Sequence, residues 1–331
     1  MNLPDQFAMS RRRAICALGA TVMGATLEAR ADGFPSHPVR IVPFGTAGGP
    51  IDTLARVYGD KLGQRWSQPI IVEPRPGASG IIAADAVAKA PADGYTVMFT
   101  LPLTHINNPI LQAKLPYHPV KDFAPITMLG TGGPVLMAKA DAPYNNLKEF
   151  VAFAKTRPKG ISYGSWGNGS NAHLFGELLK RESGAPLIHV AYKAEAGAHN
   201  DLFGGMLDVA WANPSTARTH MQAGKMKALG IASTRRMSIL ADVPTFTEQG
   251  FKGYDIDSWI GVYAPAKTAQ PVIDAWVAAL REITAMPDVA ARLNAFGFEP
   301  LGNTPTQFLQ RYNADYARIA DLIKAAGVTA E

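Results

Sequence analysis

The sequence predicts an α/β protein of two lobes, in which each lobe is a mostly parallel sheet flanked by helices. Two observations predict this fold. Short apolar runs alternate with helical patterns in residues 39–100, and the same scheme returns in residues 161–212. Glycine-rich loops also stand between several strands and the helices that follow them. Such alternation is typical of parallel sheets with helices on both faces.

In the first half, three apolar strands alternate with two helices. The first helical pattern rests on Leu54, Val57, Tyr58 and Leu62, which share one face at helical spacing. The expected strands cover 39–44, 69–73 and 95–100, and the expected helices cover 53–62 and 81–90.

The second half repeats the scheme, so we expect a second lobe. Its expected strands cover 161–164, 187–191 and 209–212, and its expected helices cover 171–183 and 199–204. The chain must cross between the lobes twice, near 133–140 and near 258–264. The predicted first lobe therefore combines 35–136 with 260–331, and the second covers 137–259.

The N-terminus has the parts of a secretory signal peptide. Three arginines, 11–13, precede the uncharged run 14–27, and Ala29-Arg-Ala31 provides a small-x-small cleavage site. The arginines match the twin-arginine signal only in part. A transmembrane anchor is the alternative, but this run is shorter than the roughly 20 apolar residues that a span needs. We therefore expect residues 1–31 to be cleaved and the protein to be exported.

Composition agrees with an exported protein that is held together by its core. The single cysteine, Cys16, lies within the predicted signal peptide, so the mature chain would carry no disulfide. The formal charge of +5 falls to about +3 without the signal peptide. So small and evenly spread a charge does not favour binding to nucleic acid or to a membrane surface.

Three glycine-rich loops are the candidate binding elements, and they cover residues 43–52, 73–80 and 163–173. In open α/β sheets, ligands bind beyond the carboxyl ends of the strands, where such loops lie. Glycine allows close approach of the backbone, and a helix start offers unpaired N–H groups and a partial positive charge. An anion satisfies these groups best. Any one of these loops could instead be only a tight turn.

Other chemistries lack their motifs. Gly167-x-Gly-x-x-Ala172 matches a dinucleotide fingerprint, but no acidic residue ends the next strand, where Ala191-Tyr-Lys193 stands. The serines form no Gly-x-Ser-x-Gly turn, and the histidines lack the pairing of zinc ligands. We therefore expect no cofactor, no metal and no catalytic residue. A secreted hydrolase or dehydrogenase would need a motif of this kind.

A series of motifs in order resembles the solute-binding receptors of tripartite tricarboxylate transporters, also called the Bug or TctC family. The resemblance runs from about Pro35 to Gly327. The motifs lie at 42–52, 72–78, 91–96, 121–125, 167–174, 189–193 with 200–202, 244–250, and 258–265.

The resemblance implies the two-lobed periplasmic-binding-protein (Venus flytrap) fold, and a periplasmic receptor that closes its lobes around an organic anion and delivers it to a membrane permease. We expect the protein to be a monomer. Closure is expected because each lobe holds half of the site. It places Pro43, Phe44, Gly48, Gly49 and Asp52 at one end of the ligand. From the second lobe it places Ser165, Asn168, Gly169, Ser170, His173 and Tyr192, and we add Ser79 and Trp166. Asp201 and Asp208 are expected to be structural, and contact with an amine or hydroxyl of the ligand is the alternative.

Departures from the family pattern concern specificity. Trp166 stands where family members usually have a small residue, Pro74 where they have Asn, and Ala191 and Ala194 where they have Pro and Gly. Trp166 could stack on an aromatic acid or shrink the pocket for a small dicarboxylate. Citrate, dicarboxylates, acidic amino acids and aromatic acids all remain candidates. A sensor that binds the same ligand is the alternative to a transport receptor.

Overall fold

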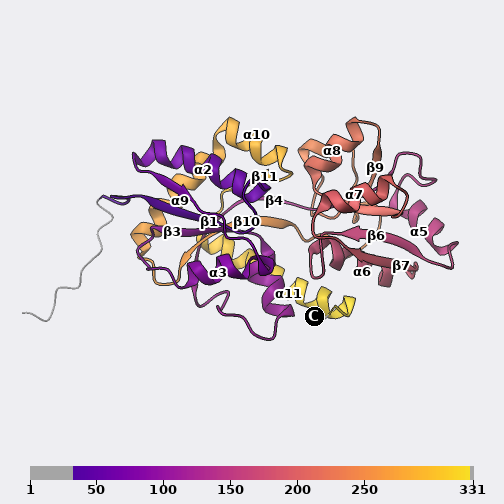
Figure 1. Cartoon of the computed structure of the whole chain (residues 1–331), viewed down its shortest axis with the longest axis horizontal. Coiled ribbons are helices and arrows are strands. Elements are labelled where there is room, and N and C mark those ends of the chain that lie inside the picture. Colours follow the sequence, from indigo (N-terminus) through magenta and orange to yellow (C-terminus); the bar gives the residue numbers. More distant parts are fainter. Residues whose placement is uncertain (1–32, 329–331) are drawn as a thin grey trace, which may run out of the picture.

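A computed structural model describes residues 33–328 and contains two sheets flanked by helices (Figure 1). The predicted signal peptide lies outside the described residues. The first sheet has the order β11-β4-β10-β3-β1-β2, and the second β7-β6-β8-β5-β9. The strands are β1 (Val39–Pro43), β2 (Ile70–Val72), β3 (Thr96–Thr100), β4 (Phe123–Gly132), β5 (Val135–Lys139), β6 (Ile161–Ser165), β7 (Leu187–Ala191), β8 (Val209–Ala212), β9 (Met226–Ile231), β10 (Ser258–Pro265) and β11 (Glu299–Pro300). The predicted two-lobed α/β fold is confirmed.

Both sheets contain antiparallel pairs that the sequence pattern did not predict. β1 pairs in parallel with β2 and β3, but β10 runs antiparallel to β3 and β4. In the second sheet, β5 is likewise antiparallel to β8 and β9. β5 and β10 are the strands that follow a crossing between the lobes. Each begins at the end of its sheet where its neighbouring strands finish, so it runs antiparallel to those neighbours.

The four predicted helices are present as α2, α3, α6 and α7, with shifts at some of their ends, and the remaining helices were not predicted. They are α2 (Pro50–Trp66), α3 (Ile81–Ala88), α4 (Asn108–Leu111), α5 (Leu147–Lys155), α6 (Asn171–Ser183), α7 (Glu195–Phe203), α8 (Pro214–Gln222), α9 (Gln270–Ala285), α10 (Pro287–Ala295) and α11 (Pro305–Ala326). Helix α2 starts three residues before the predicted 53, because Pro50 suits the first helical position. It ends where Ser67 adopts a left-handed conformation. Helix α6 has the predicted bounds.

Helices bury both faces of the first sheet. On one face, Tyr58 of α2 and Trp276 of α9 pack with Ile41 of β1. On the other face, Ala83 of α3 and Phe308 of α11 belong to the same core as Val42, the residue after Ile41 in β1. Apolar burial of this extent is the main favourable term in folding. Within residues 33–328, no helix is both long and apolar enough to cross a membrane.

The chain crosses between the lobes at two neighbouring places. β4 ends at Gly132 and β5 begins at Val135, while β9 ends at Ile231 and β10 begins at Ser258. The sheet assignments therefore lie two residues from the predicted boundaries at 136/137 and 259/260. A Cβ atom at Gly133 would lie 1.9 Å from the carbonyl oxygen of Ala232, so only glycine fits there.

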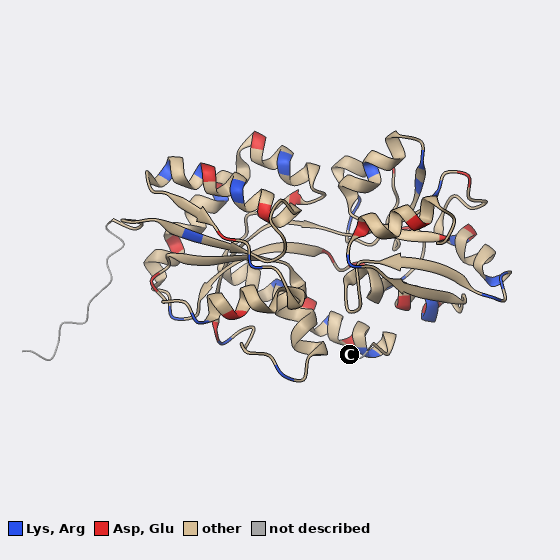
Figure 2. Cartoon of the chain, in the orientation of Figure 1, with Lys and Arg blue, Asp and Glu red and all other residues tan. Residues whose placement is uncertain are grey.

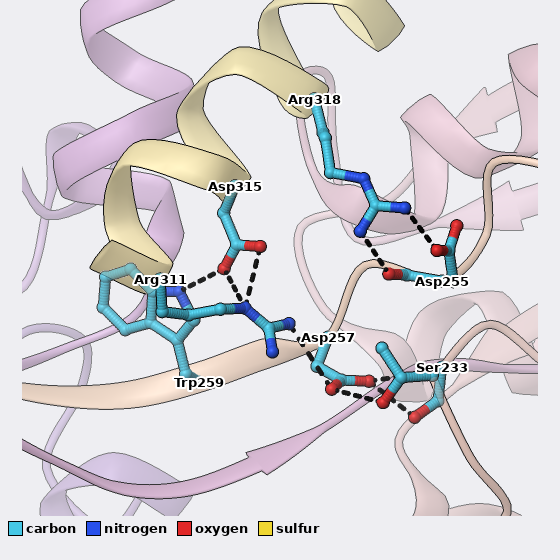
Figure 3. A network of polar contacts seen from close by, with 8 residues as sticks. Ser233, Asp255, Asp257, Trp259, Arg311, Asp315 and Arg318 are labelled. Carbon is cyan, nitrogen blue, oxygen red and sulfur yellow. Dashed lines mark hydrogen bonds and ion pairs between the residues drawn. The ribbon is translucent and has the colours of Figure 1, made fainter. Parts of the chain in front are cut away.

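Polar contacts join the second crossing to helix α11 (Figure 3). Asp257 accepts hydrogen bonds from the Ser233 hydroxyl at 2.7 Å and from the Thr234 N–H at 2.9 Å. It also faces Arg311, whose guanidinium lies 3.4 Å away and bonds Asp315 at 2.9 Å. Helix α11 thus holds the segment where the chain returns to the first lobe, and it continues to lie against α6 of the second lobe (Figure 1).

Candidate ligand-binding cleft

A cavity of about 720 Å³ lies between the two lobes and is lined from both. Its volume is within the range of small-molecule sites. Most of its wall consists of segments that follow the carboxyl ends of strands. These segments are Phe44 after β1, 101–103 after β3, 166–171 after β6, 191–193 and 195 at and after the end of β7, and 213–214 after β8. This is the edge at which open α/β sheets bind ligands.

The first-lobe loop after β1 folds back on itself. The Gly48 N–H donates to the Asp52 carboxylate at 2.8 Å, and the Gly49 N–H donates to the Thr46 carbonyl oxygen at 3.1 Å. Burial alone would raise the pKa of Asp52, but the hydrogen bonds from Arg56 and Gly48 lower it below its usual value. The Asp52 carboxylate is therefore charged and already occupied at neutral pH.

The second-lobe loop after β6 is shaped by buried side chains behind it. The Ser170 hydroxyl accepts from the His173 N–H at 3.3 Å and caps helix α6. The Gly169 N–H donates to His173 Nδ1 at 3.1 Å, and the Ser165 hydroxyl is hydrogen-bonded to His189 Nε2 at 2.6 Å. Burial lowers the pKa of both histidines, that of His189 to about 4. Both rings are therefore neutral, as an accepting His173 Nδ1 requires.

Tyr192 forms part of the wall after β7, and its hydroxyl is fixed from behind. The hydroxyl donates to the Asp201 carboxylate at 2.5 Å. Burial and the Asp201 carboxylate raise the pKa of Tyr192 to about 12. Asp208 accepts from the Ser162 N–H at 2.8 Å and from its hydroxyl at 2.7 Å. Both aspartates thus hold structural hydrogen bonds.

The lobes touch across one side of the cleft. The side-chain amide of Asn107 donates to the Gly169 carbonyl oxygen at 2.9 Å and to Asn171 Oδ1 at 3.2 Å. A Cβ atom at Gly169 would lie 2.5 Å from the Leu111 side chain. Asn107 ends a π-helical turn, Leu103–Asn107, a form that occurs often at functional sites.

Hydroxyl groups from elsewhere in the first lobe stabilise this π-helical turn. The Tyr117 hydroxyl donates to the Thr104 carbonyl oxygen at 2.6 Å, and the Tyr312 hydroxyl of α11 donates to the His105 carbonyl oxygen at 2.9 Å. The turn can therefore keep its unusual shape and hold Asn107 toward the second lobe.

Three helix starts meet at the second-lobe wall, those of α6, α7 and α8. The first N–H groups of a helix have no partner within it and carry a partial positive charge. In the described part of the chain, the wall has two charged side chains, Lys193 and Glu195. Elsewhere along the chain, by contrast, charged residues of both signs are interspersed over both lobes (Figure 2). The cleft thus offers mainly neutral donors beside apolar and aromatic groups.

Seven of the thirteen predicted site residues line the cavity. They are Phe44, Ser79, Trp166, Asn168, Gly169, Ser170 and Tyr192. The other six lie outside its wall, namely Pro43, Gly48, Gly49, Asp52, Ser165 and His173.

Other wall residues were not predicted. Among them are 101–103 after β3, Asn107, Leu111, Glu195 and Asn213. The rule that ligands bind beyond strand ends, applied to β3 and β8, would have pointed to 101–103 and Asn213. No sequence motif marks Asn107 or Leu111.

Comparison with known proteins identifies the family. The model of the tripartite tricarboxylate transporter family receptor matches residues 54–328. The chain belongs to this family. It is 34% identical over 310 residues to a UPF0065 protein of Bordetella pertussis, covering 93% of this chain and 94% of that relative. The predicted family resemblance is confirmed.

Two solved structures of similar sequence have the same fold. R. palustris Rpa4515, solved with adipate, is 30% identical, with a TM-score of 0.81 over 90% of this chain and 100% of that one. MatC (Rpa3494) from Rhodopseudomonas palustris, solved with bound malate, is 31% identical, with a TM-score of 0.74 over 88% of this chain and 100% of that one.

Proposed function

We propose that this chain is a periplasmic receptor that captures one small organic carboxylate between its lobes and delivers it to a tripartite tricarboxylate-type membrane permease. The observation that carries the proposal is the interlobe cavity, where the glycine-rich segment 166–171 and the starts of α6, α7 and α8 from the second lobe face mainly apolar groups of the first. Helix starts and backbone N–H groups favour anions. A charge-assisted hydrogen bond contributes roughly 1.5–3 kcal/mol, so two or three suffice to fix one carboxylate.

The related structures support this ligand class. Adipate and malate, the ligands of the two solved relatives, are both small carboxylates. The signal-peptide pattern in residues 1–31 supports export, and the family supports a permease as partner. We propose that the mature chain acts as a monomer, with one ligand for each pair of lobes.

The second lobe supports a receptor over an enzyme. Ser165 and His189 resemble a nucleophile with its base, since their side chains are hydrogen-bonded at 2.6 Å. However, Ser165 is buried outside the cavity wall, and its oxygen also accepts from the Gly167 N–H at 3.2 Å. This pair is placed to shape the loop beside the ligand, and a substrate in the cavity would not reach it.

A thermal-shift screen of the protein from Asp32 onward, against organic acids, tests the capture. A ligand at 100 times its Kd stabilises the fold by about 2.7 kcal/mol, which raises the Tm of a chain of this size by roughly 4 °C. A shift with one class of acid supports a carboxylate receptor. No shift with aliphatic acids, aromatic acids or amino acids would exclude carboxylate capture. Delivery predicts that cells without this chain lose uptake of the acid at low external concentration.

A further inference from the structure

One carboxylate of the protein itself lies in the wall of the ligand cavity. Glu195 is the first residue of α7, and 16% of its side chain is exposed. Its Oε1 accepts from the Asn213 N–H at 2.8 Å, and its Oε2 accepts from the Asn213 side-chain amide at 2.6 Å. Asn213 is the residue directly before α8. Glu195 therefore connects the starts of two helices that face the ligand space.

The hydrogen bonds fit the ionised form of Glu195. Burial raises its pKa, and the hydrogen bonds from Asn213 and Thr216 oppose this. Separate donors reach both oxygens, which suits a carboxylate better than a carboxylic acid, whose hydroxyl oxygen donates. Glu195 thus presents a negative charge at this part of the wall.

No cation of the described chain forms a close ion pair with this charge. His199 Nε2 is 3.8 Å from Glu195 Oε1, but this nitrogen is hydrogen-bonded to the Trp211 carbonyl oxygen at 3.1 Å. Burial lowers the pKa of His199, so its ring is neutral at pH 7. Lys193 is exposed and takes part in none of the ion pairs within residues 33–328. Buried charges are normally paired, so a cation of the ligand would supply the partner that the protein does not provide for Glu195.

The start of α6, in the same wall, has the opposite character. Its first turn contains no acidic residue, and Gly169, Ser170 and Asn171 bring it to the cavity. The start of α8 offers less, because Pro214 lacks an N–H and the Asn213 N–H is already bonded to Glu195. The start of α6 is therefore suited to an anion of the ligand. At the starts of α7 and α8, the protein already supplies an anion, the Glu195 carboxylate.

We propose that the ligand carries one carboxylate, held near the start of α6, and that its other end is a hydrogen-bond donor, best an ammonium group, that faces Glu195. This inference rests on the proposed function and narrows its ligand class. A second carboxylate at the far end would meet Glu195 as a like charge, which is unfavourable in a partly buried site. Simple dicarboxylates are therefore poor ligands of this chain.

Matched acids test the proposal, because they differ only at the far end. We would measure Kd by calorimetry for adipate, hexanoate and 6-aminohexanoate, and for succinate, butanoate and 4-aminobutanoate. The amino acid of each set should bind about tenfold or more tighter than the uncharged acid, with the dicarboxylate weakest. A dicarboxylate that binds tightest would overturn the proposal and leave carboxylate capture intact. An uncharged acid that equals the amino acid would also overturn it.

Variants separate the two hypotheses further. Glu195→Gln keeps an oxygen that can accept from the Asn213 N–H but removes the charge. This substitution should weaken the binding of the amino acids about tenfold and strengthen the binding of the dicarboxylates. Glu182→Gln is the matched control, because Glu182 is exposed on the same lobe outside the cavity. It should change neither the affinity for the amino acids nor that for the dicarboxylates. If Glu195→Gln leaves the order of affinities unchanged, Glu195 does not select the ligand. If no acid binds the wild-type protein, the proposed function itself fails.

Discussion

Replacing Arg311 by methionine should destabilise the protein by about 2–3 kcal/mol. Arg311 lies between two carboxylates, that of Asp315 at 2.9 Å and that of Asp257 at 3.4 Å (Figure 3). The Asp315 side chain is 1% exposed and that of Asp257 is 6% exposed. Methionine keeps much of the apolar stem of Arg311, so the change mainly removes the cation.

The magnitude follows from what remains after the cation is gone. Removing one partner of a buried ion pair typically costs about 3–5 kcal/mol. We take a lower value because the Arg311 side chain is 30% exposed. Asp315 would also keep a hydrogen bond from Trp259 Nε1 at 3.2 Å, and Asp257 would keep those from Ser233 and Thr234.

The deficit should depend on pH with a defined sign. Burial raises the pKa of Asp315, and Arg311 opposes this rise. Without Arg311, the pKa of Asp315 in the folded state rises further above its unfolded value. The folded protein then loses stability at pH values above this pKa, where Asp315 is charged and buried. It regains that stability as the pH falls and Asp315 binds a proton. The difference in stability between variant and wild type should therefore be larger at pH 8 than at pH 5.

Urea unfolding of both proteins at the two pH values measures this difference. Arg318→Met is the matched control, since Arg318 lies on the same helix and pairs with Asp255 where both side chains are about 40% exposed or more. An exposed pair contributes at most about 1 kcal/mol. If Arg311→Met costs no more than Arg318→Met, or if its deficit grows on acidification, the buried-charge reasoning is refuted.

Three further substitutions test the cleft and the crossing between the lobes. Trp166→Ala should change the Kd of any bound acid about tenfold or more if the ring contacts the ligand, and an unchanged Kd by calorimetry would place Trp166 outside the site. Asn107→Ala should weaken ligand binding several-fold with a small loss of Tm, because it removes the bond to Gly169 that closes the cleft; an unchanged Kd would contradict this role. Gly133→Ala should lower the Tm by roughly 5 °C or more, since its Cβ meets the Ala232 carbonyl oxygen, and a wild-type melting curve would show that the crossing tolerates a side chain.

The order of strands and helices could be predicted because it depends on local patterns. The apolar periodicity of Leu54, Val57, Tyr58 and Leu62 and the glycine-rich loops have direct counterparts in α2 and in the strand-end segments. The direction of β5 and β10 could not be predicted in this way. A strand's direction depends on which lobe the chain has come from, and this information is not present in the strand's own residues.

The candidate site was predictable only where a loop had a recognisable composition. Trp166, Asn168, Gly169 and Ser170 belong to such a loop and line the cavity. Asn107 reaches the cavity through a π-helical turn that depends on a hydroxyl from α11, some 200 residues later. Contacts of this kind arise from tertiary packing, which single-sequence patterns do not contain.

The place of β10 in the first sheet has a consequence for the order in which the lobes can assemble during synthesis. All five strands of the second sheet lie within residues 135–231, so that sheet is complete before β10 exists. β10 lies between β3 and β4, and these two strands have no partner joining them until residue 265 has been made. A chain that stops at residue 250 would therefore contain a whole second sheet and a first sheet split in two. The lobe that begins later in the sequence is the one that can finish first.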